Sequence, residues 1–401
     1  MAVLRKPSFA DSMPKGWRPR PATQEPSGEQ MRATKAIIHL ENLRHNIRLV
    51  RRHVGPEKKI CMAVKADAYG HGVHRIVQTA LSEGVEYFAI ATVQEGIDIR
   101  TEGVDAPILL LSLPLPEELP ELIRHGLTPL VTDRHFLQVL EKAAAAQGRR
   151  IEVHLKVDTG MGRIGCSPEE AVELAALTSA SDWLRLAGVC THFPVADLPE
   201  NDFTMAQIER FAKLVEAIRT KGIDPGLIHA ANSGAVLGYP ASHFDMVRPG
   251  ILLYGYYPSR DQPRTLPVLP VMELESRIVF LKRVPKGTPI SYGMTYVTDR
   301  ETTIATIPVG YGDGYSRLLS GRGEVLVGRR RYPIVGRICM DQLMVDLGSA
   351  PSVELYDRVT LFGPDAEGPD AERIATLIGT IPYEVTCDIN KRVPRLYTDQ
   401  D

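Results

Sequence analysis

The chain has 401 residues, 44% of them hydrophobic and 24% charged, so it is long enough for two globular domains. Its formal net charge of −2 argues against nucleic acid as the main partner. No apolar run approaches the roughly 18 residues that a membrane span needs. The five cysteines are scattered without a CxxC motif, which is typical of a cytoplasmic protein and predicts neither a disulfide framework nor a structural zinc site.

Residues 1–33 differ in composition from the rest of the chain. They contain Pro7, Pro14, Pro19, Pro21 and Pro26 among polar residues and lack the hydrophobic core of a secretory signal. Because such a segment buries too little apolar surface to offset the entropy of ordering, we predict a disordered N-terminal tail.

Between residues 34 and 265, short apolar segments alternate with segments of helical periodicity. A strand at residues 35–40 and a helix at 41–53 come first, and helices such as 168–179 and 204–221 follow. Eight further strands are predicted at residues 60–64, 86–91, 106–111, 127–131, 151–157, 184–191, 227–230 and 245–254. Eight strand–helix alternations predict an α/β fold, a (β/α)8 TIM-type barrel. The chain has no early GxGxxG motif to favour a dinucleotide-binding sheet.

Residues 266–401 have a different pattern, in which β-rich runs are separated by glycine and proline turns. The runs lie at residues 271–284, 302–309, 323–327, 331–340, 344–347 and 358–361. Only residues 370–378 have helical periodicity, and a proline cluster at residues 258–270 suits a linker. We therefore predict a second, mainly β domain after the barrel.

Lys65 follows the strand at residues 60–64 and precedes a glycine-rich turn and a helix. A lysine at the end of a buried strand is costly unless its charge is paired or neutralised. A desolvated amine has a lowered pKa and condenses readily with an aldehyde such as that of pyridoxal phosphate. The alternative is a lysine whose ammonium group extends to the edge of the sheet. The segment alone leaves both interpretations open.

Other strand ends carry cationic, hydroxyl and glycine residues, and in a (β/α)8 barrel reactive groups lie at these ends. They are Lys156, Arg163, His192, Asn232, Ser233, Arg248, Gly250 and Ile251. The Ser233 hydroxyl and the backbone N–H groups of Gly250 and Ile251 suit a phosphate. Each residue alone is better explained by turn chemistry or core packing. Their coincidence at one face of the barrel favours an electropositive binding site.

The predicted β domain contains tyrosines beside glycines in turns, for example Tyr292 and Tyr311. Glycine lets a backbone approach a ligand closely, so such a turn can present a phenol to a site. From the spacing alone, however, Tyr292 is better explained as a surface turn residue.

Nine motifs occur in a fixed order between residues 33 and 397. They are AVKADAYGHG, HLKVDTGMGRIG, THF, ANSG, MVRPGILLYG, ISYGMTY, GYGDGY, GRICMDQ and YEV. Together they closely resemble the alanine racemase family, pyridoxal-phosphate enzymes built from a barrel and a β domain. The resemblance implies interconversion of L- and D-alanine, supply of D-alanine for peptidoglycan, and a homodimer whose active site is shared between subunits.

The resemblance also implies a role for each matching residue. Lys65 would form the Schiff base with the cofactor, and Tyr292, donated by the second subunit, would be the opposing base. The cofactor would be held by Lys65, Tyr69, Arg163, His192, Asn232, Ser233, Arg248, Gly250, Ile251 and Tyr383. Arg163 and the backbone of Met340 would bind the substrate carboxylate, and a carbamylated Lys156 would fix Arg163. Tyr311, Asp197, Arg317 and Arg337 would line the access channel.

These residue types suit proton transfer to and from both faces of an amino acid. A phenol has an unperturbed pKa of about 10, so Tyr292 would need nearby positive charge, supplied through His192 and Arg248, to act as a base. Arg248 at the pyridine nitrogen would limit electron withdrawal and so suppress transamination. Tyr292, Tyr383 and Met340 would leave room for little beyond a methyl side chain.

Several other functions remain open from the sequence. One is a racemase for serine or for a broad range of amino acids, and another is a pyridoxal-phosphate decarboxylase of the same architecture. A cofactor-holding protein would need only the barrel. A metal-dependent hydrolase would need carboxylate partners for His71 and His74, and none is convincing. The remaining alternative is a soluble barrel whose glycines only form turns.

Overall fold

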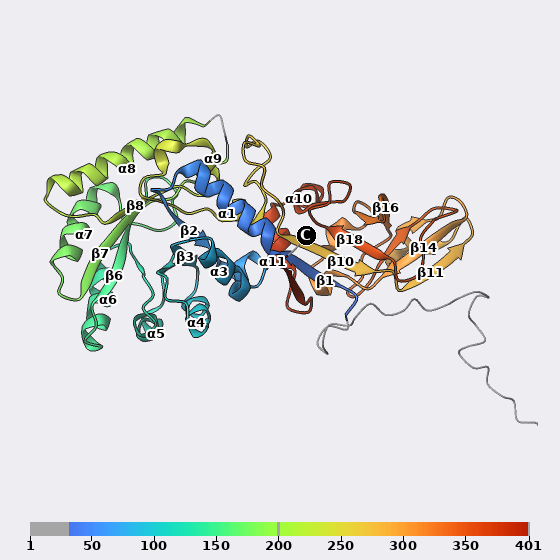
Figure 1. The fold of residues 1–401 in the computed structure, drawn as a ribbon, viewed down its shortest axis with the longest axis horizontal. Helices are drawn as coiled ribbons and strands as arrows, with labels where there is room; N and C mark the ends of the chain where they lie inside the picture. The colour runs from blue at the N-terminus through green and yellow to red at the C-terminus, as the bar shows by residue number, and fades with distance from the viewer. Residues whose placement is uncertain (1–31, 199–200, 400–401) are drawn as a thin grey trace, which may run out of the picture. The chain divides into compact units, whose positions relative to one another are not determined.

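An eight-stranded parallel sheet closes into a barrel in the first part of the chain (Figure 1). The computed structural model describes residues 32–198 and 201–399, so the predicted disordered tail lies outside the described residues except for residues 32 and 33. The barrel strands are β2 (Lys59–Ala63), β3 (Tyr87–Ile90), β4 (Ile108–Leu110), β5 (Leu130–Val131), β6 (Ile151–Lys156), β7 (Leu184–Cys190), β8 (Leu227–His229) and β9 (Met246–Val247).

The strand order is β4-β3-β2-β9-β8-β7-β6-β5, and every pairing is parallel. The two ends of this order meet where the N–H of Leu110 donates to the carbonyl of Thr128 (2.9 Å) and the N–H of Thr128 donates to the carbonyl of Ile108 (2.9 Å). These bonds close the sheet, and the predicted (β/α)8 barrel is confirmed.

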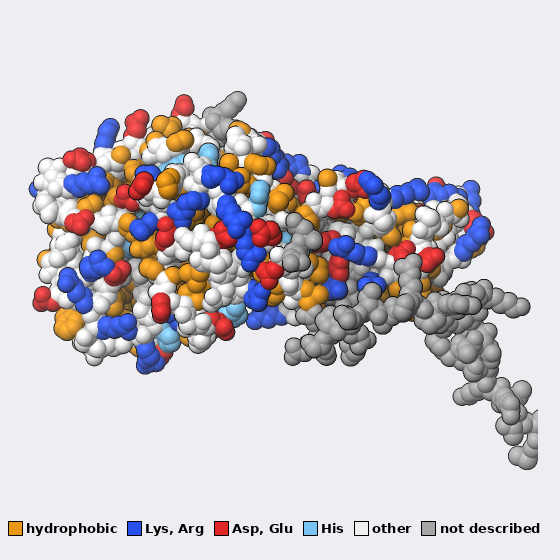
Figure 2. Space-filling model, in the orientation of Figure 1, with side chains coloured by type: hydrophobic (Ala, Val, Ile, Leu, Met, Phe, Trp, Pro, Cys, Tyr) orange, Lys and Arg blue, Asp and Glu red, His pale blue; other side chains and the backbone are white. Residues whose placement is uncertain are grey.

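Helices on the outside of the barrel present one apolar face to it. They are α1 (Leu40–Val54), α3 (Val73–Ser82), α4 (Val93–Thr101), α5 (Leu119–Arg124), α6 (Arg134–Ala146), α7 (Pro168–Ala180), α8 (Asp202–Thr220) and α9 (Ser233–Gly238). In α1, for example, Leu43, Ile47, Val50 and Val54 recur at helical spacing and are all buried. The face of the molecule shown in Figure 2 has charges of both signs interspersed over its surface.

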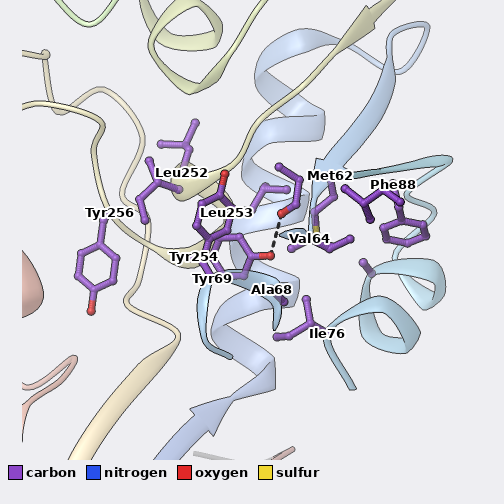
Figure 3. Packing of buried hydrophobic residues seen from close by; sticks show 14 of the residues in the cluster. Met62, Val64, Ala68, Tyr69, Ile76, Phe88, Leu252, Leu253, Tyr254 and Tyr256 are labelled. Atoms are coloured by element: carbon purple, nitrogen blue, oxygen red, sulfur yellow. Dashed lines mark hydrogen bonds between the residues drawn. The ribbon is translucent and has the colours of Figure 1, made fainter. Parts of the chain in front are cut away.

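The last barrel strand is shorter than the predicted range of residues 245–254. Only Met246–Val247 pairs as β9, and the 3₁₀ turn η4 (Ile251–Tyr254) replaces the remainder. Pro249 has no N–H to donate to a strand ladder, so the sheet cannot continue through it. The apolar residues of η4 are instead fully buried, and Leu253 and Tyr254 lie next to Tyr69 in the core cluster (Figure 3).

A nine-stranded sheet forms the C-terminal part, as predicted for a mainly β domain. Its order is β11-β14-β17-β16-β15-β18-β10-β1-β19. The bounds are β1 (Lys35–His39), β10 (Met272–Arg277), β11 (Phe280–Val284), β14 (Thr302–Ile307), β15 (Glu324–Val327), β16 (Arg330–Val335), β17 (Leu343–Asp346), β18 (Arg358–Phe362) and β19 (Arg395–Thr398). A small hairpin, β12 (Pro289–Ile290) and β13 (Tyr296–Val297), carries the 3₁₀ turn η5 (Tyr292–Met294).

The strand predicted at residues 35–40 does not belong to the barrel, contrary to expectation. As β1 it pairs antiparallel with β10 and parallel with β19, so the first strand among the described residues lies within the C-terminal sheet (Figure 1). Its side chains alternate between half-buried and buried, which is typical of a strand with one covered face. In the barrel strand β2, in contrast, Ile60–Ala63 are buried on both faces.

Two helices close the C-terminal part, whereas only one was predicted. Helix α10 (Ala371–Ile378) matches the prediction, and α11 (Pro382–Asp388) was missed. The missed helix is only seven residues long and contains the β-branched residues Val385 and Thr386, which weaken its helical signal. It packs directly on the turn after β2: a Cβ added to Gly70 would overlap the Thr386 carbonyl oxygen. Only glycine therefore allows this close approach.

Candidate active site

The turn after β2, labelled α2 (Lys65–Tyr69), is left-handed. Ala66, Asp67, Ala68 and Tyr69 all have φ between 52° and 54°, although none is glycine. Left-handed backbone costs L-residues roughly 1–2 kcal/mol each. The predicted glycine-rich turn follows at Gly70 and Gly72, but the left-handed stretch before it was not predicted. Such strain persists only where the surroundings enforce it, and it is typical of functional sites.

Hydrogen bonds hold this turn at both ends. The N–H of Ala68 donates to the Val64 carbonyl (2.8 Å), and the N–H of Gly70 donates to the Ala66 carbonyl (2.9 Å). Below the turn, the hydroxyl of Tyr254 donates to the Ala63 carbonyl (2.9 Å), and the rings of Tyr254 and Tyr69 pack edge to face (Figure 3). The strand end that carries Lys65 is therefore rigidly supported.

A cavity of about 340 Å³ opens at the C-terminal ends of the barrel strands. Ten predicted site residues line it: Lys65, Tyr69, Lys156, Arg163, His192, Asn232, Ser233, Arg248, Gly250 and Tyr383. Four of these are lysine or arginine, and no Asp or Glu is among the described residues that line the cavity. The structure therefore places these ten residues around one cavity that carries more positive than negative side chains.

Lys65 is half-buried at the wall of this cavity. Burial lowers its pKa, the positive charge of Arg163 lowers it further, and the carboxylate of Glu95 opposes both effects. A larger fraction of neutral amine follows at neutral pH, and the neutral amine is the form that attacks a carbonyl group. This environment favours a reactive Lys65 amine over a lysine whose ammonium group extends to the edge of the sheet.

Arg248 is buried, and its hydrogen-bond acceptors are neutral. Its Nη2 donates to the carbonyls of Thr191 (2.7 Å) and Ala230 (3.0 Å) and lies 3.3 Å from His192 Nδ1. Its Nη1 lies 2.8 Å from His229 Nδ1. Because a guanidinium group only donates, His229 must accept at Nδ1, so its proton is on Nε2.

The same reasoning assigns the donor and the acceptor in the contact between His229 and the neighbouring His154. His229 Nε2 lies 2.7 Å from His154 Nδ1, so His229 donates and His154 accepts. Burial lowers the pKa of His154 to about 3, and burial together with Arg248 holds the pKa of His229 well below its usual range. Both histidines are thus neutral and orient the guanidinium group of Arg248.

Hydroxyl groups gather at the end of the cavity where β8 and β9 end. Ser233 Oγ accepts the N–H of Gly250 (2.9 Å), and a Cβ at Gly250 would lie 2.8 Å from the Tyr69 hydroxyl oxygen, so glycine is required there. The rings of Tyr69 and Tyr383 are 5.6 Å apart. Burial raises the pKa of both phenols, which therefore remain protonated and can donate hydrogen bonds to an anion.

Lys156 is buried at the end of β6, and its Nζ donates to the Val157 carbonyl (3.0 Å). Burial lowers its pKa. In the following loop, the carboxylate of Asp158 accepts the N–H groups of Gly160, Met161 and Gly162 at 2.7–2.9 Å. This carboxylate shapes the loop that brings Arg163 to the cavity.

The remaining predicted site residues do not line the cavity: they are Tyr292, Met340, Tyr311, Arg317, Arg337, Asp197 and Ile251. Ile251 is fully buried at the start of η4 beside Gly250. Asp197 lines a neighbouring cavity of about 270 Å³ with Tyr257 and Pro382. The other five lie in the C-terminal part, where Tyr292 is 71% exposed and Met340 52% exposed.

Hydrogen bonds connect these C-terminal residues to one another. The strand predicted at residues 331–340 ends at Val335, because Gly336 has a φ of 68° and turns the chain. In the resulting turn, the carbonyl of Arg337 accepts the Ser291 hydroxyl (2.6 Å), and the carbonyl of Met340 accepts the N–H of Gly312 (2.8 Å). These bonds tie the segments of Tyr292, Tyr311 and Met340 into one exposed group.

The sequence analysis did not single out some of the cavity residues. They are Ala63, Leu111, Ser112, Leu113, Leu130, Ile164 and Cys190. Leu111, Ser112 and Leu113 directly follow β4, so the rule that barrel sites form at strand ends could have found them. Glu95, whose charge acts on Lys65, lies on a helix and fits no strand-end rule.

His74 has a carboxylate neighbour that the sequence analysis did not find, Glu102 at 3.8 Å, and both side chains are half exposed. Among the described residues, no three His, Cys, Asp or Glu side chains gather as a metal site. His71 is instead buried, with Nδ1 2.9 Å from the Tyr69 carbonyl and its ring against Tyr254.

We expect His71 to make the protein less stable in acid. Burial lowers its pKa to about 4, whereas the unfolded side chain titrates near 6.5. The unfolded chain therefore takes up a proton first, and stability present above pH 6.5 is lost as the pH falls towards 4. His71→Asn should reduce this loss by up to about 1.4 kcal/mol per pH unit. Urea unfolding at pH 7, 5.5 and 4.5 measures the effect, with half-exposed His74→Asn as the control; equal slopes for both variants would contradict the assignment.

Two family models cover most of the chain. Alanine racemase, N-terminal domain, matches residues 38–258, and alanine racemase, C-terminal domain, matches residues 271–397. The chain belongs to the alanine racemase family. The family predicted from the motifs is thereby confirmed, and with it the assignment to the racemases, a class of isomerase.

Individual alanine racemases match this chain over nearly their whole length. The alanine racemase of Treponema denticola is 50% identical over 92% of this chain and 99% of its own, and that of Chlorobaculum tepidum is 44% identical over 92% and 96%. Among solved structures, alanine racemase of Clostridium difficile 630 has a TM-score of 0.88 at 38% identity, covering 92% of this chain and 97% of its own. That of Bacillus anthracis, solved with bound L-Ala-P, has a TM-score of 0.86 at 34% identity, covering 92% and 96%.

Among residues 32–198 and 201–399, no helix combines the length and apolar character needed to cross a bilayer.

Proposed function

We propose that this protein interconverts L- and D-alanine with pyridoxal 5'-phosphate as cofactor, and so supplies D-alanine for peptidoglycan. The observation that carries the proposal is a half-buried lysine of lowered pKa in a cavity whose described lining has four cationic side chains and no carboxylate. Family membership and the relative with bound L-Ala-P support the substrate. The predicted cytoplasmic location stays a prediction.

The donor set of the cavity fits this cofactor. An aldehyde needs an amine, which Lys65 supplies, and a phosphate needs hydrogen-bond donors, which the hydroxyl groups of Tyr69, Tyr383 and Ser233 can provide. Ile251, at the start of η4, would add a backbone N–H, and Asn232 would complete the lining near Ser233. Arg248, oriented by two neutral histidines, would face the ring nitrogen.

When bound, pyridoxal phosphate withdraws electrons from the amino acid and so acidifies its Cα–H. Lys65 Nζ would hold or release a proton on one face of the substrate, and the hydroxyl of Tyr292 would do so on the other. His192, 3.3 Å from Arg248, would connect the guanidinium group to this hydroxyl. Arg163 and the Met340 backbone would hold the carboxylate, with Lys156 carbamylated to fix Arg163.

The second subunit of a homodimer would supply Tyr292, together with Met340 and the predicted access-channel residues Tyr311, Arg317 and Arg337. None of these side chains lines the cavity of its own subunit. Large apolar side chains in the same turns are exposed, among them Met294 and Leu318. Exposure of this kind is typical of a protein interface. The proposal also includes Asp197 as a residue that lines the access channel.

The reaction is tested by incubating the purified enzyme with L-alanine in deuterated water and following circular dichroism and Cα–H exchange. Loss of optical rotation with deuterium incorporation at Cα supports racemisation. Parallel assays with serine and lysine separate an alanine enzyme from a broad-range racemase, and release of carbon dioxide would indicate a decarboxylase instead.

Tyr383→Phe should weaken cofactor binding while leaving the fold intact. The variant removes one buried hydroxyl, whose raised pKa makes it a donor to the phosphate. A hydrogen bond to a charged group contributes about 1.5–3 kcal/mol, which corresponds to roughly a 10–100-fold higher Kd. Fluorescence titration of the apoenzyme measures this Kd, with Tyr356→Phe, an exposed tyrosine outside the site, as the control. An unchanged Kd for Tyr383→Phe would remove this hydroxyl from the phosphate site.

A further inference from the structure

The carboxylate of Glu95 joins two segments that meet beside Lys65. Its Oε1 accepts the N–H of Ala66, the residue directly after Lys65, at 2.6 Å. Its Oε2 accepts the N–H groups of Ala91 (2.8 Å) and Thr92 (3.1 Å), where β3 ends and α4 begins. One half-buried side chain thus ties the turn of Lys65 to the adjacent strand of the barrel.

The bond to Ala66 satisfies a donor that the turn cannot satisfy by itself. In the left-handed turn, the N–H groups of Ala68, Gly70 and His71 donate to carbonyls of residues 64–68. The first N–H groups of a helical turn have no such partner within the turn. Ala66, the second residue of α2, carries one of them, and Glu95 supplies its acceptor. Because the backbone here is strained, losing this bond would allow it to relax.

We propose that Glu95 is a positioning residue for Lys65: its carboxylate holds the left-handed turn in place and puts a negative charge beside the reactive amine. The proposal deepens the function proposed above, and it rests on Lys65 as the amine that binds the cofactor.

The groups around Lys65 show why this charge matters. Arg163, from the loop after β6, acts on Lys65 with a positive charge, and the His192 imidazole lies on the same side of the barrel. Negative charge on Glu95 from α4 or on the Cys387 thiol from α11 would raise the pKa of Lys65. Burial raises the pKa of that thiol to about 11, so the thiol is uncharged near pH 7. Glu95 is therefore the anion that balances Arg163.

A competing explanation is that Glu95 only caps helix α4. Its side chain accepts the Thr92 N–H while Thr92 Oγ1 accepts the Glu95 N–H (3.3 Å), a capping box. Thr92→Ala removes the second bond and leaves the carboxylate free to bind Ala66. It is therefore a matched control that weakens the helix start without touching the turn of Lys65.

The test compares Glu95→Gln, Thr92→Ala and the wild-type holoenzyme. The first measurement is the pH titration of the absorption band of the lysine-bound cofactor, and the second is amide hydrogen exchange at residues 66–69. For Glu95→Gln we expect a downward shift of the titration midpoint by about one pH unit and faster exchange. For Thr92→Ala we expect wild-type values in both measurements, with a lower melting temperature.

Wild-type values for Glu95→Gln, or equal changes in both variants, would overturn the proposal and leave Glu95 as a helix cap. If Glu95→Gln does not fold, Glu95→Asp replaces it, because it keeps the charge and shortens the reach. Faster exchange at Ala66 in that variant supports the proposal, and wild-type exchange overturns it. Failure of the wild-type protein to bind the cofactor at residue 65 would instead contradict the proposed function itself.

Discussion

Lys65→Ala should lose racemase activity by roughly 10⁴-fold, because the variant removes both the group that binds the cofactor and one of the two bases. The side chain lies at the cavity wall in a strained, well-supported turn, so truncation removes the amine without opening the barrel core. Steady-state racemisation of L- and D-alanine measures the loss. We expect both directions to be affected, since the cofactor serves both.

Lys59→Ala provides a matched control for this experiment. Lys59 begins β2 at the opposite end of the barrel and does not line the cavity. The racemase activity of the Lys59→Ala variant should remain close to that of the wild type. Lys65→Arg is informative as well, since arginine keeps the positive charge but cannot condense with an aldehyde. Substantial activity in Lys65→Arg would mean that charge alone is required and would contradict a covalent role.

Tyr292→Phe should reduce activity by roughly 10²–10⁴-fold, the usual contribution of one acid–base group. The side chain is 71% exposed, so loss of its hydroxyl should not disturb packing within the subunit. Exposed Tyr356→Phe is the control, with activity expected to stay at the wild-type level.

Mixing variants tests whether Tyr292 acts across a dimer. Co-expressed in equal amounts, Lys65→Ala and Tyr292→Phe should recover about a quarter of the wild-type activity. Half of the dimers would be mixed, and each mixed dimer would have one site with an intact lysine and an intact tyrosine from the other subunit. If Tyr292 served its own subunit, no mixed dimer would contain a complete site, and activity would stay at the level of the separate variants.

The sequence predicts much of the cavity because parallel strands end at one edge of a barrel. Lys65, Lys156, His192, Ser233 and Arg248 are far apart in the chain, yet each follows a recognisable apolar strand. Knowing the fold class was therefore enough to place them together. Their detailed arrangement, such as the neutral histidines behind Arg248, depends on packing and was not predictable.

Other features could not be read from the sequence for physical reasons. The left-handed turn after Lys65 contradicts the local preferences of alanine, aspartate and tyrosine, and the bond from Ala66 to the distant Glu95 helps to hold it. The pairing of β1 with the C-terminal sheet joins Lys35 to Glu275, a contact that no local pattern encodes. The missed helix α11 carries Tyr383 to the cavity, so its omission hid how the C-terminal part completes the site.

The central claim is that the amine of Lys65 binds an aldehyde cofactor in the barrel cavity. Borohydride reduction of the holoenzyme makes such a bond permanent, and peptide mapping by mass spectrometry then identifies the modified residue. The account predicts a pyridoxyl-phosphate adduct on the peptide that contains Lys65. An adduct on another lysine such as Lys156, or none in an active enzyme, would contradict it.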